Sequence, residues 1–236
     1  EKNIKKAAYW MRLSAEQGHA AAQFRLGVMY QKGRGVAQDL EEAVKWYRMS
    51  AEQGVLSAQY NLGDIYRAGH GVARDFAEAA KWYRMSADQG HVSSQYMLGI
   101  FFHSGFGVDR DRGEAAYWYR KSGRQGHSDA QVALGMLYKH GFGVVQDFGE
   151  AAKWYRMSAE QGDPEAQFNL GVMYEQGKGV IQDNVIAHMW FNIAASRGYE
   201  IARESRDVVM SRMTAEQVGE AQKLARECVR RNLKNC

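Results

Sequence analysis

The sequence has one proline and two cysteines in 236 residues, and it contains no long apolar run. A helix that crosses a bilayer needs about 18 or more consecutive apolar residues, so the sequence predicts no transmembrane segment. Two cysteines are too few for a disulfide framework or a four-ligand zinc site. Charge of one sign is also scarce. Lys and Arg number 31 against 27 Asp and Glu, in mixed order, which argues against a nucleic-acid partner.

Glycine, by contrast, is abundant, and the sequence repeats itself. The six tryptophans are spaced by 36 residues: Trp10, Trp46, Trp82, Trp118, Trp154 and Trp190. A fixed period of about 20 to 50 residues is typical of solenoid and propeller proteins. Within one period, Ala22, Leu26 and Met29 follow helical spacing, and apolar residues within 40–51 do so again. The pattern therefore predicts two helices in each repeat.

The residues at the predicted helix ends support this interpretation. We expect a first helix near 20–32 and a second near 40–53, with copies displaced by 36 residues. Asp39 precedes the second helix and Glu42 follows three residues later, so Asp39 is predicted to accept a hydrogen bond from a first-turn N–H. The glycine pairs between the helices are predicted to be turns with positive φ, and the tryptophans to pack between helices.

Two sequence segments resemble a known family. The unit A-x-x-x-L-G-x-x-Y-x-x-G-x-G-V-x-x-D at 22–39 and the unit E-A-V-K-W-Y-R-M-S-A-E-Q-G at 42–54 resemble the Sel-1-like repeat, a relative of the tetratricopeptide repeat. The resemblance implies an all-α fold, a right-handed α/α superhelical solenoid of 36-residue helix-turn-helix repeats, in a bacterial protein. It predicts a solenoid domain over 1–198, with one half repeat and five helix pairs.

The remaining residues, 199–236, leave the period and are predicted to form a C-terminal helical cap. Thr214 with Gln217 makes a capping-box start for the last helix. Cys228 and Cys236 are predicted to form a disulfide, which favours a periplasmic or secreted protein; two free thiols in the cytoplasm are the alternative. Because the chain opens at Glu1 inside a second helix, we expect a processed or truncated product with sequence missing upstream.

No arrangement of residues predicts catalysis. The chain has no S-x-x-K motif and no cysteine pair in each repeat, so a β-lactamase-like hydrolase is not favoured, and the repeated serines fall on helices. His70, His103 and His140 lie near successive loops, but a shared metal site is not favoured either. We expect no enzyme activity, no metal and no cofactor. The sequence predicts no oligomeric state.

Function is expected where the repeats differ. Positions 21, 25, 28 and 32 form one stripe of the first helix, and their residues change from copy to copy. In tetratricopeptide-like solenoids the first helices line the concave surface, so the resemblance implies a groove here. The predicted groove residues are Arg25, Val28, Lys32, Asn61, Asp64, Met97, Ile100, Ala133, Met136, His140, Asn169 and Val172.

The apolar centre of this stripe suits an adaptable contact with a peptide or helix. It consists of Met97, Ile100 and Met136, which we expect to be exposed. We therefore expect a protein-protein interaction scaffold that binds a protein or peptide partner in the groove. Arg48 and Arg84 are predicted to lie on the outer face of the second helices, outside the site.

Two alternatives remain. The first is a glycan or peptidoglycan-associated binding protein that uses exposed aromatic residues such as Phe106, Phe142 and Tyr199. The second is that the stripe is an ordinary solvated face without a partner.

Overall fold

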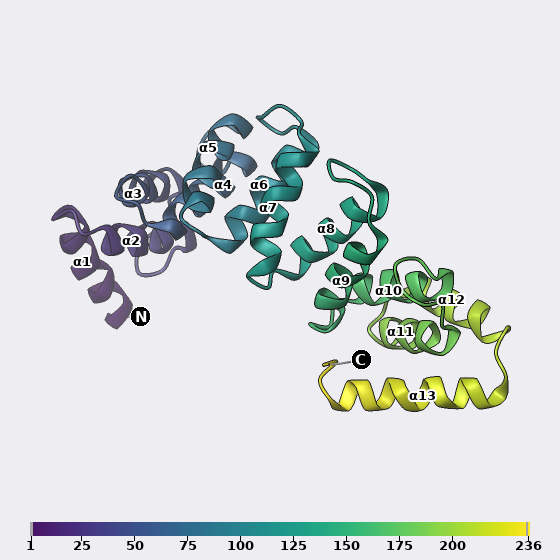
Figure 1. The fold of residues 1–236 in the computed structure, drawn as a ribbon. Helices are drawn as coiled ribbons and strands as arrows, with labels where there is room; N and C mark the ends of the chain where they lie inside the picture. The colour runs from purple at the N-terminus through teal and green to yellow at the C-terminus, as the bar shows by residue number, and fades with distance from the viewer. Residues whose placement is uncertain (1, 235) are drawn as a thin grey trace. The chain divides into compact units, whose positions relative to one another are not determined.

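The structure is a computed structural model that describes residues 2–234 and residue 236. These described residues form thirteen helices and no strand (Figure 1). In chain order the helices are α1 (Lys2–Glu16), α2 (Ala20–Lys32), α3 (Leu40–Glu52), α4 (Leu56–Ala68), α5 (Phe76–Asp88), α6 (Val92–Ser104), α7 (Arg112–Arg124), α8 (Ser128–His140), α9 (Phe148–Ala159), α10 (Pro164–Gln176), α11 (Asn184–Ser196), α12 (Glu200–Met210) and α13 (Ala215–Arg230). The predicted all-α solenoid of helix pairs is confirmed.

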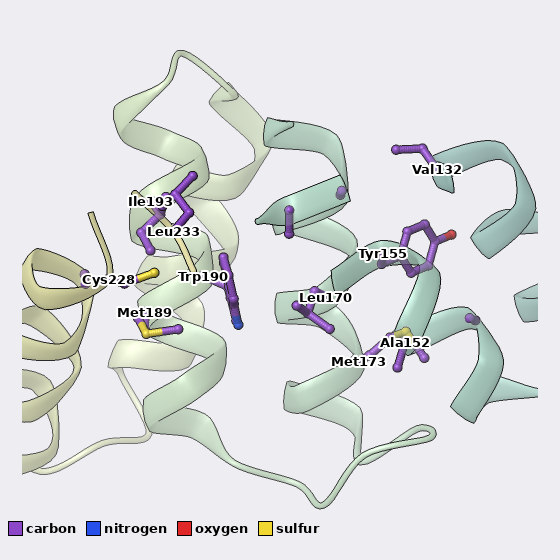
Figure 2. Close-up of a cluster of buried hydrophobic side chains, with 14 residues drawn as sticks. Val132, Ala152, Tyr155, Leu170, Met173, Met189, Trp190, Ile193, Cys228 and Leu233 are labelled. Atoms are coloured by element: carbon purple, nitrogen blue, oxygen red, sulfur yellow. The ribbon is translucent and has the colours of Figure 1, made fainter. Parts of the chain in front are cut away.

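The chain divides into two compact units, each with its own buried core. Unit 1 is Glu1–Trp118 and unit 2 is Tyr119–Cys236. In unit 1, Leu26, Tyr47 and Leu62 belong to one buried cluster. In unit 2, Figure 2 shows Leu170 and Trp190 in a core that also includes Cys228.

The predicted helix limits are confirmed, and the caps explain them. The sequence predicts a first helix at 20–32, which α2 matches, and a second at 40–53, which α3 matches to within one residue. The Asp39 side chain accepts a hydrogen bond from the Glu42 N–H at 2.9 Å, and Asp75 and Asp147 cap α5 and α9 in the same way. These carboxylates satisfy backbone donors that the first turn of a helix leaves unpaired.

A close contact between the two helices of a repeat explains one of the periodic glycines. The Tyr83 ring of α5 is fully buried and lies against Gly63 of α4. A Cβ atom placed on Gly63 would lie 2.5 Å from Tyr83 Cε1, and one placed on Gly27 would lie 2.8 Å from Tyr47 Cδ1. A side chain of any size at these positions would therefore push the two helices apart.

We expect Gly63→Ala to lower the free energy of unfolding by about 1 to 2 kcal/mol. Overpacking a core typically costs about 1 to 3 kcal/mol, and the better helix propensity of Ala offsets up to about 1 kcal/mol of this. Gly219→Ala in α13 is the matched control, because a Cβ there meets nothing within 4 Å and should stabilise the helix. Urea denaturation measures both variants. Equal stability of the two would show that the contact with Tyr83 relaxes freely.

The tryptophans pack between helices as predicted, with one exception. Trp154 lies against Gly123 of the second helix before it, since a Cβ on Gly123 would lie 3.1 Å from the indole. Trp118 shares a buried cluster with Ala87, which stands the same 31 residues before it. Trp10, however, is 66% exposed, so the prediction is wrong for this copy.

The C-terminal segment stays in register for one helix longer than the sequence analysis predicts. Helix α12 begins at Glu200, 36 residues after α10 begins at Pro164, and it packs against α11 as a further first helix. Helix α13 then starts early, after a loop of only residues 211–214, and packs against α11 (Figure 1). The predicted capping box is present, because Thr214 and Gln217 each bond the other's backbone N–H.

Candidate binding groove

The twelve predicted groove residues lie on the first helices, and none of them is fully buried. Four are exposed: Arg25, Lys32, Met136 and His140. Eight are half-buried: Val28, Asn61, Asp64, Met97, Ile100, Ala133, Asn169 and Val172. The stripe at positions 25, 28 and 32 is therefore accessible in both units.

In unit 1, Asp64 belongs to a hydrogen-bonded network rather than standing alone. The Tyr83 hydroxyl donates to Asp64 Oδ1 at 2.7 Å, and the Arg67 guanidinium donates to the same oxygen at 3.1 Å. Burial, followed by the charge of Asp64, raises the pKa of Tyr60 to about 12 and raises that of Tyr83 as well. Both hydroxyls remain protonated at neutral pH, and Asp64 and Arg67 act as an ion pair.

The apolar residues of the stripe are less exposed in unit 1 than the sequence predicts. Met97 is half-buried because it packs against the cluster that contains Tyr83 and Phe101. Ile100 is also half-buried. The predicted exposure holds only for Met136 of unit 2, which is 39% exposed.

In unit 2, side-chain contacts join the first helices laterally. Lys139 Nζ donates to Asn169 Oδ1 at 3.4 Å, and Asn169 Nδ2 donates to the Glu165 carbonyl oxygen at 3.0 Å. Burial, and then the nearby charge of Lys178, lowers the pKa of Lys139. The amide of Asn169 is thus already engaged by neighbouring groups of the protein.

The stripe continues onto α12 and the residues just after it, which the sequence analysis missed. One period after Asn169, Val172 and Gln176 stand Ser205, Val208 and Arg212. Val208 is 49% exposed, and Arg212 Nη1 lies 3.1 Å from Glu175 Oε1 of α10. The signal was present in the sequence as the 36-residue spacing from Pro164 to Glu200, but the loss of the repeat motif after residue 199 concealed it.

The histidines do not converge on a metal site. The His91 ring caps α6 by accepting from the Ser94 N–H at 3.2 Å. Burial lowers the pKa of His103, which is half-buried, whereas His70 and His140 are exposed. Across residues 2–234 and 236, no group of three or more His, Cys, Asp or Glu side chains is placed to hold a metal ion.

The aromatic residues weighed for glycan binding are each packed against another ring. Phe106 stacks on Phe76 with centroids 5.2 Å apart. Phe142 stacks on His140 at 5.3 Å, and Tyr199 lies 5.3 Å from Phe168. Phe106 and Phe142 stay partly exposed, at 44% and 37%.

Arg48 and Arg84 differ from their predicted place on a free outer face. The Arg48 guanidinium lies 5.9 Å from the centre of the Tyr66 ring and donates to its hydroxyl. Arg84 lies over Phe102 at 5.4 Å and over Trp118 at 5.1 Å. Both arginines tie a second helix to the following repeat through cation–π contacts, so substituting them would disturb packing.

The two cysteines are bonded to each other in the structure. Their Cα atoms are 5.5 Å apart, and Cys228 is buried in the same cluster as Trp190 and Leu233 (Figure 2). The bond links α13 to the end of the chain. Separately, no helix among the described residues is both long enough and apolar enough to span a bilayer.

Comparison with known proteins gives consistent matches to one fold. The family model described as Sel1 repeat matches residues 1–19, 20–55, 56–91, 92–127, 128–163 and 164–199. The crystal structure of a protective antigen from uropathogenic Escherichia coli strains, with an SLR fold, is 37% identical with a TM-score of 0.87. The match covers 98% of this chain and 50% of that protein, so the chain spans half the length of this relative.

A second solved structure supports the same assignment. A Sel1 repeat protein from Oxalobacter formigenes is 35% identical with a TM-score of 0.76, over 87% of this chain and 82% of that one. A search among curated proteins gives no match.

Proposed function

Because the chain belongs to the Sel1 repeat family, we propose that it is a non-enzymatic scaffold that binds a protein or peptide partner along the stripe of its first helices. The observation that supports this function is the contrast within those helices. Positions such as Leu26 and Leu62 are buried and repeat, whereas positions 25, 28 and 32 are accessible and differ between copies. Repeat proteins of this kind bind partners on such extended surfaces.

A comparison of captured partners tests the proposal. The full chain is immobilised beside a groove variant, Ile100→Asp with Met136→Asp, and bound proteins are quantified by mass spectrometry. We expect at least one protein to be retained by the wild type and depleted about tenfold or more on the variant, as two buried carboxylates would cause. Equal recovery of every captured protein would place binding elsewhere or show that the stripe has no partner.

We also propose that the protein is exported, and the disulfide between Cys228 and Cys236 supports this. A bond across so short a loop contributes about 2 to 3 kcal/mol in the chain-entropy model. It persists only in an oxidising compartment.

The mass of the intact protein tests the disulfide. Unreduced protein should be lighter than reduced protein by two hydrogen atoms, and it should take up iodoacetamide only after reduction. Two thiols that react without reduction, in protein prepared from an oxidising compartment, would remove the argument for export.

A further inference from the structure

In unit 2 the stripe includes a row of three apolar residues, one of which lies outside the matched repeats. Met136 of α8, Val172 of α10 and Val208 of α12 occupy equivalent positions, 36 residues apart. Met136 is 39% exposed and Val208 is 49% exposed, while Val172 is half-buried. Ile201, seven residues before Val208 on α12, is 57% exposed.

The three helices are joined one to the next by side-chain contacts. Lys139 of α8 contacts Asn169 of α10, and Glu175 of α10 contacts Arg212, two residues after the end of α12. A ligand laid across α8, α10 and α12 would therefore meet Met136, Val172 and Val208 in turn.

One edge of this row is acidic, and its carboxylates form no ion pair with the residues that the structure describes. Asp129 and Glu165 stand at the start of α8 and α10, and neither takes part in an ion pair among the described residues. Burial, and then the charges of Asp163 and Asp129, raise the pKa of Glu165, so these carboxylates lie close enough to repel one another. A cationic ligand along this edge would relieve the repulsion.

The opposite edge has the other sign. It contains Lys139 and Lys178, which are close enough for Lys178 to lower the pKa of Lys139, together with Arg212 in its ion pair with Glu175. The apolar row is therefore flanked by acidic residues near the N-terminal ends of the first helices and by basic residues near their C-terminal ends.

The apolar row favours a ligand whose backbone groups are already hydrogen-bonded to one another. Met136, Val172 and Val208 offer no polar side-chain atoms to an extended main chain. The amide of Asn169 already bonds Lys139 and the Glu165 carbonyl. An α-helix satisfies its own N–H and C=O groups and needs only side-chain contacts, whereas an extended segment would lose hydrogen bonds to water here.

We propose that unit 2 binds an amphipathic α-helix of its protein partner, with the apolar face of that helix on Met136, Val172 and Val208 and a basic flank facing Asp129 and Glu165. This inference rests on the proposed scaffold function and specifies the partner's chemistry.

Selection from a phage-displayed library of random peptides of about 24 residues tests it, since a helix of that length is about 36 Å long. The full chain is the target, and the variant Met136→Asp with Val208→Asp is the counter-target. Val229→Asp in α13 is the matched control, because Val229 is also 49% exposed but lies outside the groove. Circular dichroism melts verify that all three proteins fold.

We expect selected peptides to be helical when bound and to have an apolar face with Lys or Arg on one flank. They should bind the variant Met136→Asp with Val208→Asp at least tenfold more weakly than the Val229 control. Proline-rich or otherwise extended binders that depend on the groove would overturn the helical occupant. An absence of any peptide whose binding depends on Met136 and Val208 would overturn the site.

A charge exchange tests the orientation. Asp129→Lys with Glu165→Lys should weaken a selected peptide about tenfold, and replacing the basic flank of that peptide by Glu should restore binding to this variant. Failure of the exchange to restore binding would reject the acidic edge as a contact. If partner capture still depends on Ile100 and Met136 while no helical peptide is selected, the scaffold function stands and this inference fails.

Discussion

Trp82→Ala is expected to lower the free energy of unfolding by about 3 to 5 kcal/mol, the usual range for emptying a buried aromatic site. Trp82 is 7% exposed and belongs to the same cluster as Ala51, Leu62 and Ile65. Its indole N–H has no hydrogen-bond partner, so the ring contributes through packing alone. For a chain of this length the loss corresponds to a decrease in melting temperature on the order of 10 °C.

Trp10→Ala supplies the control for this prediction, because it removes the same side chain from the same repeat position. Trp10 is 66% exposed, and its loss should change the melting temperature by only a few degrees. Calorimetry on both variants separates the two roles. An unchanged melting temperature for Trp82→Ala would reject its packing role and point to a ligand-binding ring.

The double substitution Ile100→Asp with Met136→Asp should weaken partner binding more than about a hundredfold. Each apolar anchor that a partner desolvates contributes on the order of 1 to 2 kcal/mol, and two carboxylates against an apolar partner add to that loss. About 3 kcal/mol in total corresponds to the stated change in affinity. Titration calorimetry with the captured partner measures it.

Matched controls come from the second helices. Met85 and Met157 are 44% and 41% exposed, close to the 39% of Met136, and they lie outside the stripe. Met85→Asp with Met157→Asp should leave the affinity within about twofold. Because Ile100 is half-buried, Met136→Asp alone is measured as well. Lost binding in the second-helix variant, with binding intact in the groove variant, would move the site to the second helices.

Much of the fold follows from residues whose effect is local. Asp39 and Glu42 define the start of α3 because a helix cap is formed by neighbours in sequence. Tyr83 and Gly63 recur together because their contact lies within one repeat. Patterns of this kind predict helix ends and buried faces without knowledge of the wider structure.

Features that depend on a particular neighbour were predicted less well. Trp10 fits the repeat pattern, yet its ring is exposed, because burial depends on a neighbouring helix and not on the pattern itself. Met97 and Arg84 occupy positions that look free on a single helix, but aromatic rings from neighbouring helices cover part of each. For the stripe, the period identified its positions as far as α10, while the loss of the repeat motif after residue 199 concealed that α12 continues it.

The separations between contacting residues bear on how such a gene can change in length. Tyr83 meets Gly63 across 20 residues, and Trp154 meets Gly123 across 31, so both contacts survive any deletion or duplication of whole periods. The segment E-A-A-K-W-Y-R-M-S-A occurs identically at 78–87 and at 150–159. Recombination between these copies would remove or add two complete repeats and leave every retained helix pair with its usual neighbours. The number of repeats can therefore change while the contacts that join neighbouring helices are kept.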